Sequence, residues 1–330
     1  MVTPQVIDDR LRAGSWKRGG RWEIPLVSPI AFPARPTPVD PYLLGVLLGD
    51  GGLTEECVAF STIDKEILDA VKIAVPNGTE VRHWDRCTYR IAVSRRTRRA
   101  SGQWERDHQL LAALRSLGLL GRHAHDKFVP NLYLWNSVMV RRALLQGLLD
   151  TDGTASKQGN SVSFCSTSER LVEAVEFLVR SLGGVARRGT PRRKTYRYRG
   201  DLRRGRPSWR VGITLPDSVA PFRLTRKLVR LMPRQARGRP SRFIVGVDDV
   251  GQSEAVCIEV NHPDQCFVAS EFIVTHNTTG GIYACTALAE RMREDGAPLP
   301  LRVGVVRDTY ENLRRTTLVS FEEQKQLLGL

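Results

Sequence analysis

The sequence lacks the marks of a disulfide-bonded, zinc-folded or membrane protein. None of its six cysteines forms a Cys-x-x-Cys pair, and no histidine stands at zinc-binding spacing from them, so neither a disulfide scaffold nor a zinc finger is indicated. No run approaches the roughly 18 apolar residues that span a bilayer. The first residues are polar and charged, where a signal peptide is hydrophobic. We therefore expect a cytoplasmic protein with no membrane partner.

Acidic residues are scarce in one segment. The 330 residues include 50 Lys and Arg against 35 Asp and Glu, a net charge of +15. Between Arg187 and Arg242, 19 basic residues accompany only two acidic ones, whereas the rest of the chain is close to neutral. A basic excess confined to one segment favours a nucleic-acid partner. A solvated basic surface is the other interpretation of such a run.

Changes in composition divide the chain into four parts. Residues 1–35 are basic and rich in proline and glycine, with one strand-like run at 22–27, and are interpreted as a linker or remnant. Residues 36–242 form the main unit. Residues 243–277 are β-rich, with strands expected at 255–260, 266–269 and 272–274. Residues 278–330 open a different, α/β unit. The expected fold class is mixed α/β (α+β).

One helix pattern occurs twice in the main unit. The copies are residues 40–50 and 137–152, and each begins with a capping residue and continues as an apolar run. In both copies a glycine, Gly45 or Gly147, precedes an Asp-Gly pair by five residues. A strand-like run and an amphipathic helix follow each copy. We therefore predict an internal duplication, with halves at about 36–135 and 136–242.

The two Asp-Gly pairs place a carboxylate, Asp50 or Asp152, at the C-terminal end of a helix. The helix dipole is negative at this end, so an acidic residue is unfavourable there unless a cation is present. If the helices pack through Gly45 and Gly147, both carboxylates converge and can hold Mg²⁺ with water and phosphate oxygens. This arrangement suits phosphodiester hydrolysis. For a single copy, Asp-Gly as a plain turn signal is the alternative.

The runs at residues 43–51 and 145–153 resemble the two LAGLIDADG motifs of dodecapeptide (DOD-type) homing endonucleases. The resemblance covers about residues 36–242. It implies a pseudo-twofold monomer whose two sheets form a saddle for double-stranded DNA. It also implies cleavage of long, asymmetric sites with Mg²⁺ bound by Asp50 and Asp152. The family has a lysine shortly before a proline between the motifs, and Lys127 matches it. Its ammonium could stabilise negative charge or order water; a solvated surface lysine is the alternative.

The basic segment alternates charged and aromatic residues around Gly200-Asp201. This pattern predicts a hairpin laid along the major groove, and a shorter basic run stands at the matching place in the first half. The residues expected to contact DNA are Arg95, Arg96, Arg98, Arg99, Arg192, Arg193, Lys194, Arg197, Arg199, Arg203, Arg204 and Arg206. Most should contact phosphate. The sequence does not distinguish the arginines that reach base edges.

Residues 257–260 and 272–278 resemble the C-terminal splicing motifs of inteins, which form part of a β-rich Hint module. The resemblance implies that the Asn277 amide attacks its own carbonyl carbon and releases Thr278, whose hydroxyl can accept an acyl group. His276 would assist as an acid or by polarising the carbonyl. Cys257 and Thr275 match the class 3 inteins, in which the cysteine is the first nucleophile. A buried structural cysteine is the alternative.

The N-terminal splicing region of an intein is missing, since no Thr-x-x-His motif and no histidine precede His83. We therefore expect splicing only with an N-terminal intein fragment in trans. Residues 278–330 resemble the ATPase in the large subunit of phage terminases, in which Thr278 would be the Mg²⁺-binding threonine of the phosphate loop. Without the glycine-rich half and the lysine of that loop, this stub should not hydrolyse ATP. Two functions remain open. One is an active homing endonuclease carried by an intein, and the other is an inactive DNA-binding remnant or half of a split intein.

Overall fold

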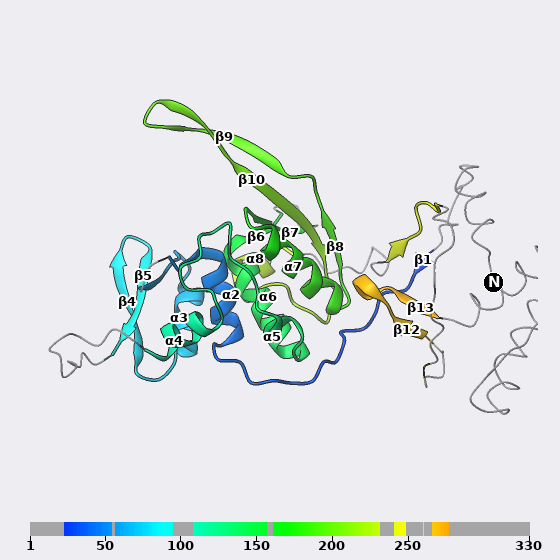
Figure 1. Cartoon of the computed structure of the whole chain (residues 1–330), viewed down its shortest axis with the longest axis horizontal. Helices are drawn as coiled ribbons and strands as arrows, with labels where there is room; N and C mark the ends of the chain where they lie inside the picture. The colour runs from blue at the N-terminus through cyan, green and yellow to red at the C-terminus, as the bar shows by residue number, and fades with distance from the viewer. Residues whose placement is uncertain are drawn as a thin grey trace, which may run out of the picture. The chain divides into compact units, whose positions relative to one another are not determined.

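The computed structural model describes residues 23–54, 57–94, 108–156, 161–231, 241–248, 260 and 266–276. The chain divides into two compact units, one of residues 26–241 and one of residues 1–25 together with 242–330. The mixed α/β class predicted from the sequence is confirmed (Figure 1). None of the described helices combines the length and apolar character needed to cross a membrane.

The first half of the larger unit contains one four-stranded sheet. Its elements are α2 (Pro41–Asp50), β2 (Gly51–Gly52), β3 (Val58–Ser61), α3 (Lys65–Ala74), β4 (Thr79–Asp85), β5 (Thr88–Val93) and α4 (Gln109–Ser116). The strands pair antiparallel in the order β2-β3-β5-β4. Helix α2 begins where the Asp-Pro pattern predicts, because the Asp40 carboxylate accepts a hydrogen bond from the Leu43 N–H at 3.0 Å.

The second half repeats this order from α6 onward, with longer helices in place of α2 and α3 and with one added strand, β9. Its elements are α5 (Asn131–Leu134), α6 (Val138–Asp152), β6 (Gly153–Ala155), β7 (Val162–Ser166), α7 (Glu169–Ser181), β8 (Val185–Arg188), β9 (Arg192–Tyr198), β10 (Asp201–Thr214) and α8 (Thr225–Leu228). The strands pair antiparallel in the order β6-β7-β10-β8, and β9 pairs with β10. Strand β10 thus takes the place that β5 has in the first half.

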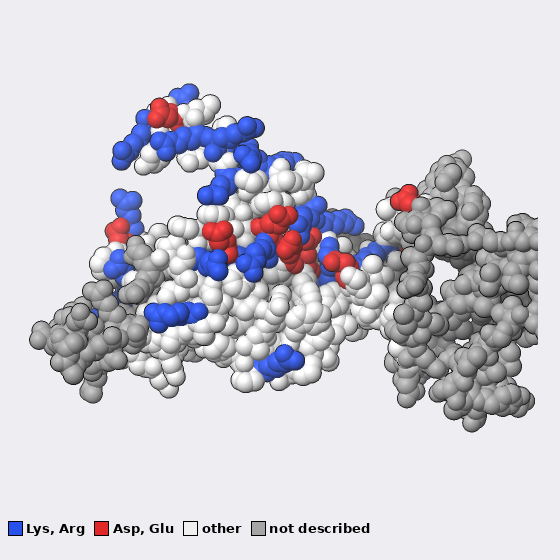
Figure 2. Space-filling model, in the orientation of Figure 1, with Lys and Arg blue, Asp and Glu red and all other residues white. Residues whose placement is uncertain are grey.

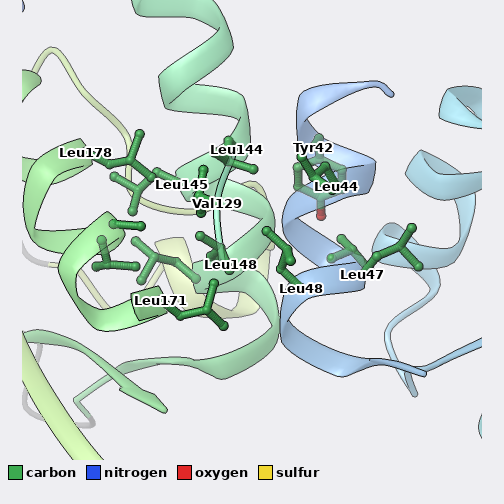
Figure 3. Close-up of a cluster of buried hydrophobic side chains, with 14 of the residues drawn as sticks. Tyr42, Leu44, Leu47, Leu48, Val129, Leu144, Leu145, Leu148, Leu171 and Leu178 are labelled. Carbon is green, nitrogen blue, oxygen red and sulfur yellow. The ribbon is translucent and has the colours of Figure 1, made fainter. Parts of the chain in front are cut away.

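Helices α2 and α6 lie side by side at the centre of the unit (Figure 3). Their leucines, among them Leu44, Leu48, Leu144 and Leu148, are fully buried, and each contributes roughly 1.5–3 kcal/mol by leaving water. The close approach depends on Gly45. A Cβ atom there would lie 2.4 Å from the Leu144 carbonyl oxygen and 2.9 Å from the Gly147 Cα. The two backbones therefore touch where the glycines cross.

Each sheet has a face that packs on the helices and an opposite face that we call the open face. The buried side chains alternate along the strands, for example Phe60 and Ile91 in the first sheet and Phe164 and Val211 in the second. The residues between them are at least partly exposed and form the open faces: Ala59, Ser61, Thr88 and Arg90 in the first sheet, and Ser163, Cys165, Arg187 and Arg210 in the second.

The hairpin predicted in the basic segment is confirmed. Strands β9 and β10 join through Arg199 and Gly200, both at positive φ. Every residue of β9 is exposed, and the hairpin projects far beyond the helices (Figure 1). Its paired strands make a long ribbon, whereas the corresponding β4–β5 hairpin of the first half is shorter.

The described residues of the smaller unit form two short antiparallel pairs. Strand β1 (Glu23–Ile24) pairs with β11 (Arg242–Phe243), and β12 (Cys266–Val268) pairs with β13 (Val274–His276). The strand predicted at 272–274 is wrong at its start. Phe272 ends a 3₁₀ turn that begins at Ser270, and its φ is 58°. The turn reverses the chain between β12 and β13, which extended residues could not do. Residues 255–259 and 277–330 lie outside the described residues.

Candidate metal centre and nucleic-acid interface

Asp50 and Asp152 are the last residues of α2 and α6. The residues directly before them, Gly49 and Thr151, are in contact, because a Cβ atom on Gly49 would lie 2.0 Å from the Thr151 Oγ1. Each helix ends in the same way, with the N–H of the following glycine donating to a backbone carbonyl four residues earlier. The structure thus brings together the two carboxylates that the sequence singles out.

The surroundings of the two carboxylates oppose their ionisation. Burial, together with the charge of Asp50, raises the pKa of Asp152 to about 6. Partial burial also raises the pKa of Asp50, although Lys127 and Lys227 act in the opposite direction. Two neighbouring carboxylates at negative helix ends create a site of negative potential. A divalent cation would relieve it.

Lys127 is not a solvated surface lysine, since only 2% of it is exposed. Its ammonium donates to backbone oxygens at the end of α2, at 3.0 Å from Leu47, 3.1 Å from Leu48, 3.3 Å from Gly49 and 2.7 Å from Gly51. Burial lowers its pKa to about 8, while Asp152 and Asp50 favour the charged form. The lysine therefore caps the helix that carries Asp50 and places a positive charge beside both aspartates.

Lys227 occupies the position in the second half that Lys127 has in the first, and the sequence analysis did not predict it as a site residue. It reaches from α8 to the end of α6, with its ammonium 2.8 Å from the Leu149 oxygen, 2.7 Å from Asp150, 3.5 Å from Thr151 and 2.6 Å from Gly153. Burial lowers its pKa to about 8 as well. The repeat itself is the signal that could have revealed it, because Lys227 follows Lys127 at almost the spacing that separates the aspartates.

Asp150 is a buried acidic residue that the sequence interpretation missed. Its carboxylate accepts hydrogen bonds from the Tyr42 hydroxyl at 2.9 Å and from the backbone N–H groups of Arg223 and Leu224 at 3.1 and 3.3 Å. Those N–H groups lie just before α8. Asp150 therefore holds the start of the helix that presents Lys227. The first half has Leu48 at the matching position of its repeat, so this arrangement belongs to one half only.

Each lysine segment is fastened to a helix of the opposite half. The Ser168 hydroxyl at the start of α7 donates to the Lys127 carbonyl oxygen at 2.6 Å. In the other direction, Arg226 of α8 forms two hydrogen bonds of 2.6 and 2.7 Å with Asp64, at the start of α3. We call these contacts the crossed tethers. They fix both ammonium groups relative to both aspartates.

The two aspartates fit a divalent ion that takes its other ligands from water and phosphate. Across the described ranges, no group of three or more His, Cys, Asp and Glu side chains converges as a metal site. An ion held wholly by protein side chains is therefore not indicated for this part of the chain. Two carboxylates beside a nucleic-acid phosphate are, however, a donor set that Mg²⁺ uses.

The predicted hairpin residues all lie on the exposed ribbon: Arg192, Arg193, Lys194 and Arg197 on β9, Arg199 in the turn, and Arg203, Arg204 and Arg206 on β10. Lys and Arg side chains cover much of this ribbon in Figure 2, whereas acidic side chains gather over the body below it. The sequence interpretation missed Arg90, Arg187 and Arg210 on the open faces. Their alternation with the buried Ile91 and Val211 is the signal that could have found them.

Several predicted residues cannot be placed. Arg95, Arg96, Arg98, Arg99, Cys257, Asn277 and Thr278 lie outside the described residues. Thr275 and His276 belong to β13, where they pair with Phe267 and Cys266 of the neighbouring strand. Of the predicted splicing residues, Thr275 and His276 are therefore the ones that belong to a described strand.

Residues 139–211 match the family model described as LAGLIDADG-like domain. Over 257 residues the chain is 32% identical to the replicative DNA helicase DnaB of Mycobacterium intracellulare, an alignment that covers 76% of this chain and 37% of that protein. Over 155 residues it is 30% identical to the DNA gyrase A subunit of Mycolicibacterium flavescens, with coverage of 44% and 26%. The chain thus spans about a third or a quarter of the length of these curated relatives.

Two solved structures of I-DmoI are also similar to the chain. One is the complex of I-DmoI with DNA and Ca, at a TM-score of 0.32 and 13% identity, covering 54% of this chain and 83% of that one. The other is a set of mesophilic variants of the homing endonuclease I-DmoI, at a TM-score of 0.34 and 13% identity, covering 58% and 95%. The family match thus makes residues 139–211 similar to a LAGLIDADG-like domain.

Proposed function

We propose that this chain is a Mg²⁺-dependent DNA endonuclease of the LAGLIDADG type, acting as a monomer on a long, asymmetric duplex site. The observation that carries the proposal is the contact between the ends of α2 and α6, which brings Asp50 and Asp152 together. Both aspartates come from one chain, so a second copy is not needed to complete the centre. The LAGLIDADG-like family match supports the same assignment.

Asp50 and Asp152 would hold the metal ion. Because the pKa of Asp152 is raised to about 6, protons compete with the ion below that pH, and the carboxylate is mostly charged above it. When bound, Mg²⁺ neutralises the scissile phosphate, activates water and stabilises the leaving 3′ oxygen. The rigid contact between the two helix ends keeps the carboxylates at a fixed separation, so little reorganisation is needed when DNA arrives.

Lys127 and Lys227 would act through their charge and through the helix ends that they fix. Each ammonium has only three N–H donors, and these donors already form hydrogen bonds with backbone oxygens at the helix ends. A direct hydrogen bond to a phosphate oxygen would therefore replace one of the bonds by which the lysine caps its helix. With a pKa of about 8, both lysines are mostly charged at pH 7, and this charge attracts the phosphate backbone to the aspartates.

A direct experiment is cleavage of a plasmid that carries the uninterrupted form of the gene in which this coding sequence lies. We expect the purified full chain to linearise this plasmid with Mg²⁺ and to leave it intact with EDTA. A matched plasmid that carries the interrupted gene should stay uncut, because the insertion divides the recognition site. Gel electrophoresis of the products measures both outcomes.

Binding without cleavage would favour the alternative of an inactive DNA-binding remnant. In that case, a gel-shift experiment would find a specific complex on the same duplex, and neither strand would be nicked with Mg²⁺ or Mn²⁺. Absence of both binding and cleavage would contradict the whole assignment.

We further propose that the endonuclease is carried within an intein that ends at Asn277. The similarity to a helicase and to a gyrase supports this, because each match covers only part of proteins with different activities. One mobile insert shared by different hosts explains such a pattern. The β12–β13 pair, which includes His276, also suits a β-rich splicing module. The terminase-like host beyond Thr278 rests on the sequence resemblance.

Mixing the chain with an N-terminal intein fragment tests the splicing proposal. We expect mass spectrometry to detect a ligated host product. The acyl group of the N-terminal host segment is transferred to the Thr278 hydroxyl, and cyclisation of Asn277 then breaks the bond to Thr278 and releases the joined segments. Asn277→Ala should remove this product, whereas Asn131→Ala, far from the junction in the sequence, should not. Ligation that persists in Asn277→Ala would refute the assigned end of the intein.

A further inference from the structure

Each hairpin carries an exposed aromatic ring with an arginine stacked on it. In the first half, the Arg90 Cζ lies 3.3 Å from the centroid of the Trp84 ring. In the second half, the Arg203 Cζ lies 4.7 Å from the centroid of the Tyr198 ring. The rings remain open to solvent, with exposed fractions of 60% for Trp84 and 46% for Tyr198.

The two stacks occupy matching places. Both aromatic residues stand near the end of the outgoing strand, and both arginines are the third residue of the returning strand, β5 or β10. The duplicated fold therefore presents the same pair of chemical groups from each half, although the sequences of the two hairpins differ.

Both arginines lie on the side of the open faces. Arg90 lies on the open face because side chains alternate along a strand and the neighbouring Ile91 is buried on the opposite face. For the long hairpin, Arg192 pairs with Ser208, which shares a face with Arg210. Alternation along β9 then places Tyr196 on the same face, and its partner across the ladder is Arg203. The stacks thus extend the two open faces outward.

A stacked arginine differs from a free one in how it can bind. The ring holds the guanidinium plane, so less side-chain freedom is lost on binding. The N–H groups at the edge of the plane stay available as a bidentate donor. In the major groove, guanine offers a matching pair of acceptors, N7 and O6. A phosphate contact needs only a nearby positive charge and gains little from a fixed plane.

We propose that Arg90 and Arg203 read guanine edges, one in each half of the DNA site, while the other hairpin arginines contact phosphate. The inference rests on the proposed DNA-binding function. Arg82 lies on the same open face as Arg90 but is not expected to read a base, because Glu80 and the Val93 carbonyl already accept its hydrogen bonds. Arg197 is not expected to read a base either, because it lies on the opposite face of the ribbon, where it pairs with Leu202.

The test measures base preference separately from charge. Duplexes that bind the full chain are selected from a randomised library in Ca²⁺, whose larger size and irregular coordination are poorly suited to catalysis. Affinity is then measured for every single base-pair change in the selected duplex and at several salt concentrations. The variants are Arg90→Lys and Arg203→Lys, with Arg197→Lys as the matched control. Trp84→Leu removes one stacking partner but keeps its arginine.

We expect Arg90→Lys and Arg203→Lys each to reduce the preference for guanine at one position by at least about fivefold. The slope of affinity against salt should not change, because lysine keeps the charge. Trp84→Leu should weaken the same preference as Arg90→Lys. Arg197→Lys should leave all preferences unchanged.

Two unfavourable outcomes are distinguishable. If the wild-type chain selects no duplex and binds none, the proposed DNA-binding function itself fails. If the chain selects a site but Arg90→Lys and Arg203→Lys weaken all duplexes equally, DNA binding stands and the assignment of these arginines to base reading is overturned.

Discussion

Asp152→Asn is expected to abolish DNA cleavage and, at the same time, to stabilise the fold. Loss of a metal-binding carboxylate should lower the cleavage rate by at least on the order of a hundredfold. The stability effect follows from the pKa of Asp152, which is raised from 3.8 to about 6. The folded state binds this proton more tightly than the unfolded state, so ionisation costs stability as pH rises from about 4 through about 6.

At pH 7 that cost is fully present in the wild type, and an amide removes it. The free energy of unfolding of Asp152→Asn should therefore exceed that of the wild type by about 2–3 kcal/mol at pH 7. The difference should vanish near pH 4. Urea denaturation in EDTA at both pH values measures it. Asp217→Asn, at an exposed loop position, is the control and should change neither stability nor cleavage.

Asp50→Asn should also stop cleavage, with a smaller stabilisation because Asp50 is more exposed than Asp152. Gel-shift affinity for the target duplex should be retained by both variants, since most of the affinity comes from basic residues elsewhere. Wild-type cleavage rates in both variants would refute the assignment of the metal centre.

Gly45→Ala is expected to cause a large loss of stability in the larger unit. The new Cβ would lie 2.4 Å from the Leu144 carbonyl oxygen and 2.9 Å from the Gly147 Cα. Both are backbone atoms and cannot rotate away, so the two helices must separate. We expect the free energy of unfolding to fall by about 3 kcal/mol or more. Thermal or urea denaturation measures this change.

Cleavage should fall as well, because separation of α2 and α6 moves the aspartates apart. A displacement of about 1 Å in a catalytic centre can cost on the order of a hundredfold in rate. Gly212→Ala is the matched control, since its nearest neighbour would be the Arg187 carbonyl oxygen at 3.9 Å. If Gly45→Ala were as stable and active as Gly212→Ala, the backbone contact would not be what joins the two carboxylates.

Local signals in the sequence predicted the two repeated helices, the helix that follows each of them, and the hairpin correctly, whereas α4, α5 and α8 were not predicted. Asp40 caps α2 as expected, and the positive-φ residues Arg199 and Gly200 turn the chain next to the predicted Gly-Asp pair. Such features depend on neighbours in the sequence, so short patterns reveal them. The 3₁₀ turn at Phe272 was not predicted, because a phenylalanine at positive φ carries no turn signal of its own.

The environment of the aspartates depended on contacts that short patterns do not contain. Asp150 binds backbone N–H groups more than 70 residues away, and Lys227 reaches the end of α6 across a similar distance in the sequence. In isolation each is an ordinary charged residue. Comparison of the two repeats gives a partial signal, because an aspartate in one half stands where the other has Leu48.

The crossed tethers limit how the two halves can be recombined. Ser168 of one half holds the chain at Lys127, and Asp64 of the other holds Arg226 next to Lys227. A chimera that exchanges one half for that of a relative would therefore inherit a lysine without its anchor. Engineers who redesign the DNA specificity of this scaffold should exchange hairpins and open-face residues, and should keep α3, α7 and both lysine segments as one inherited set.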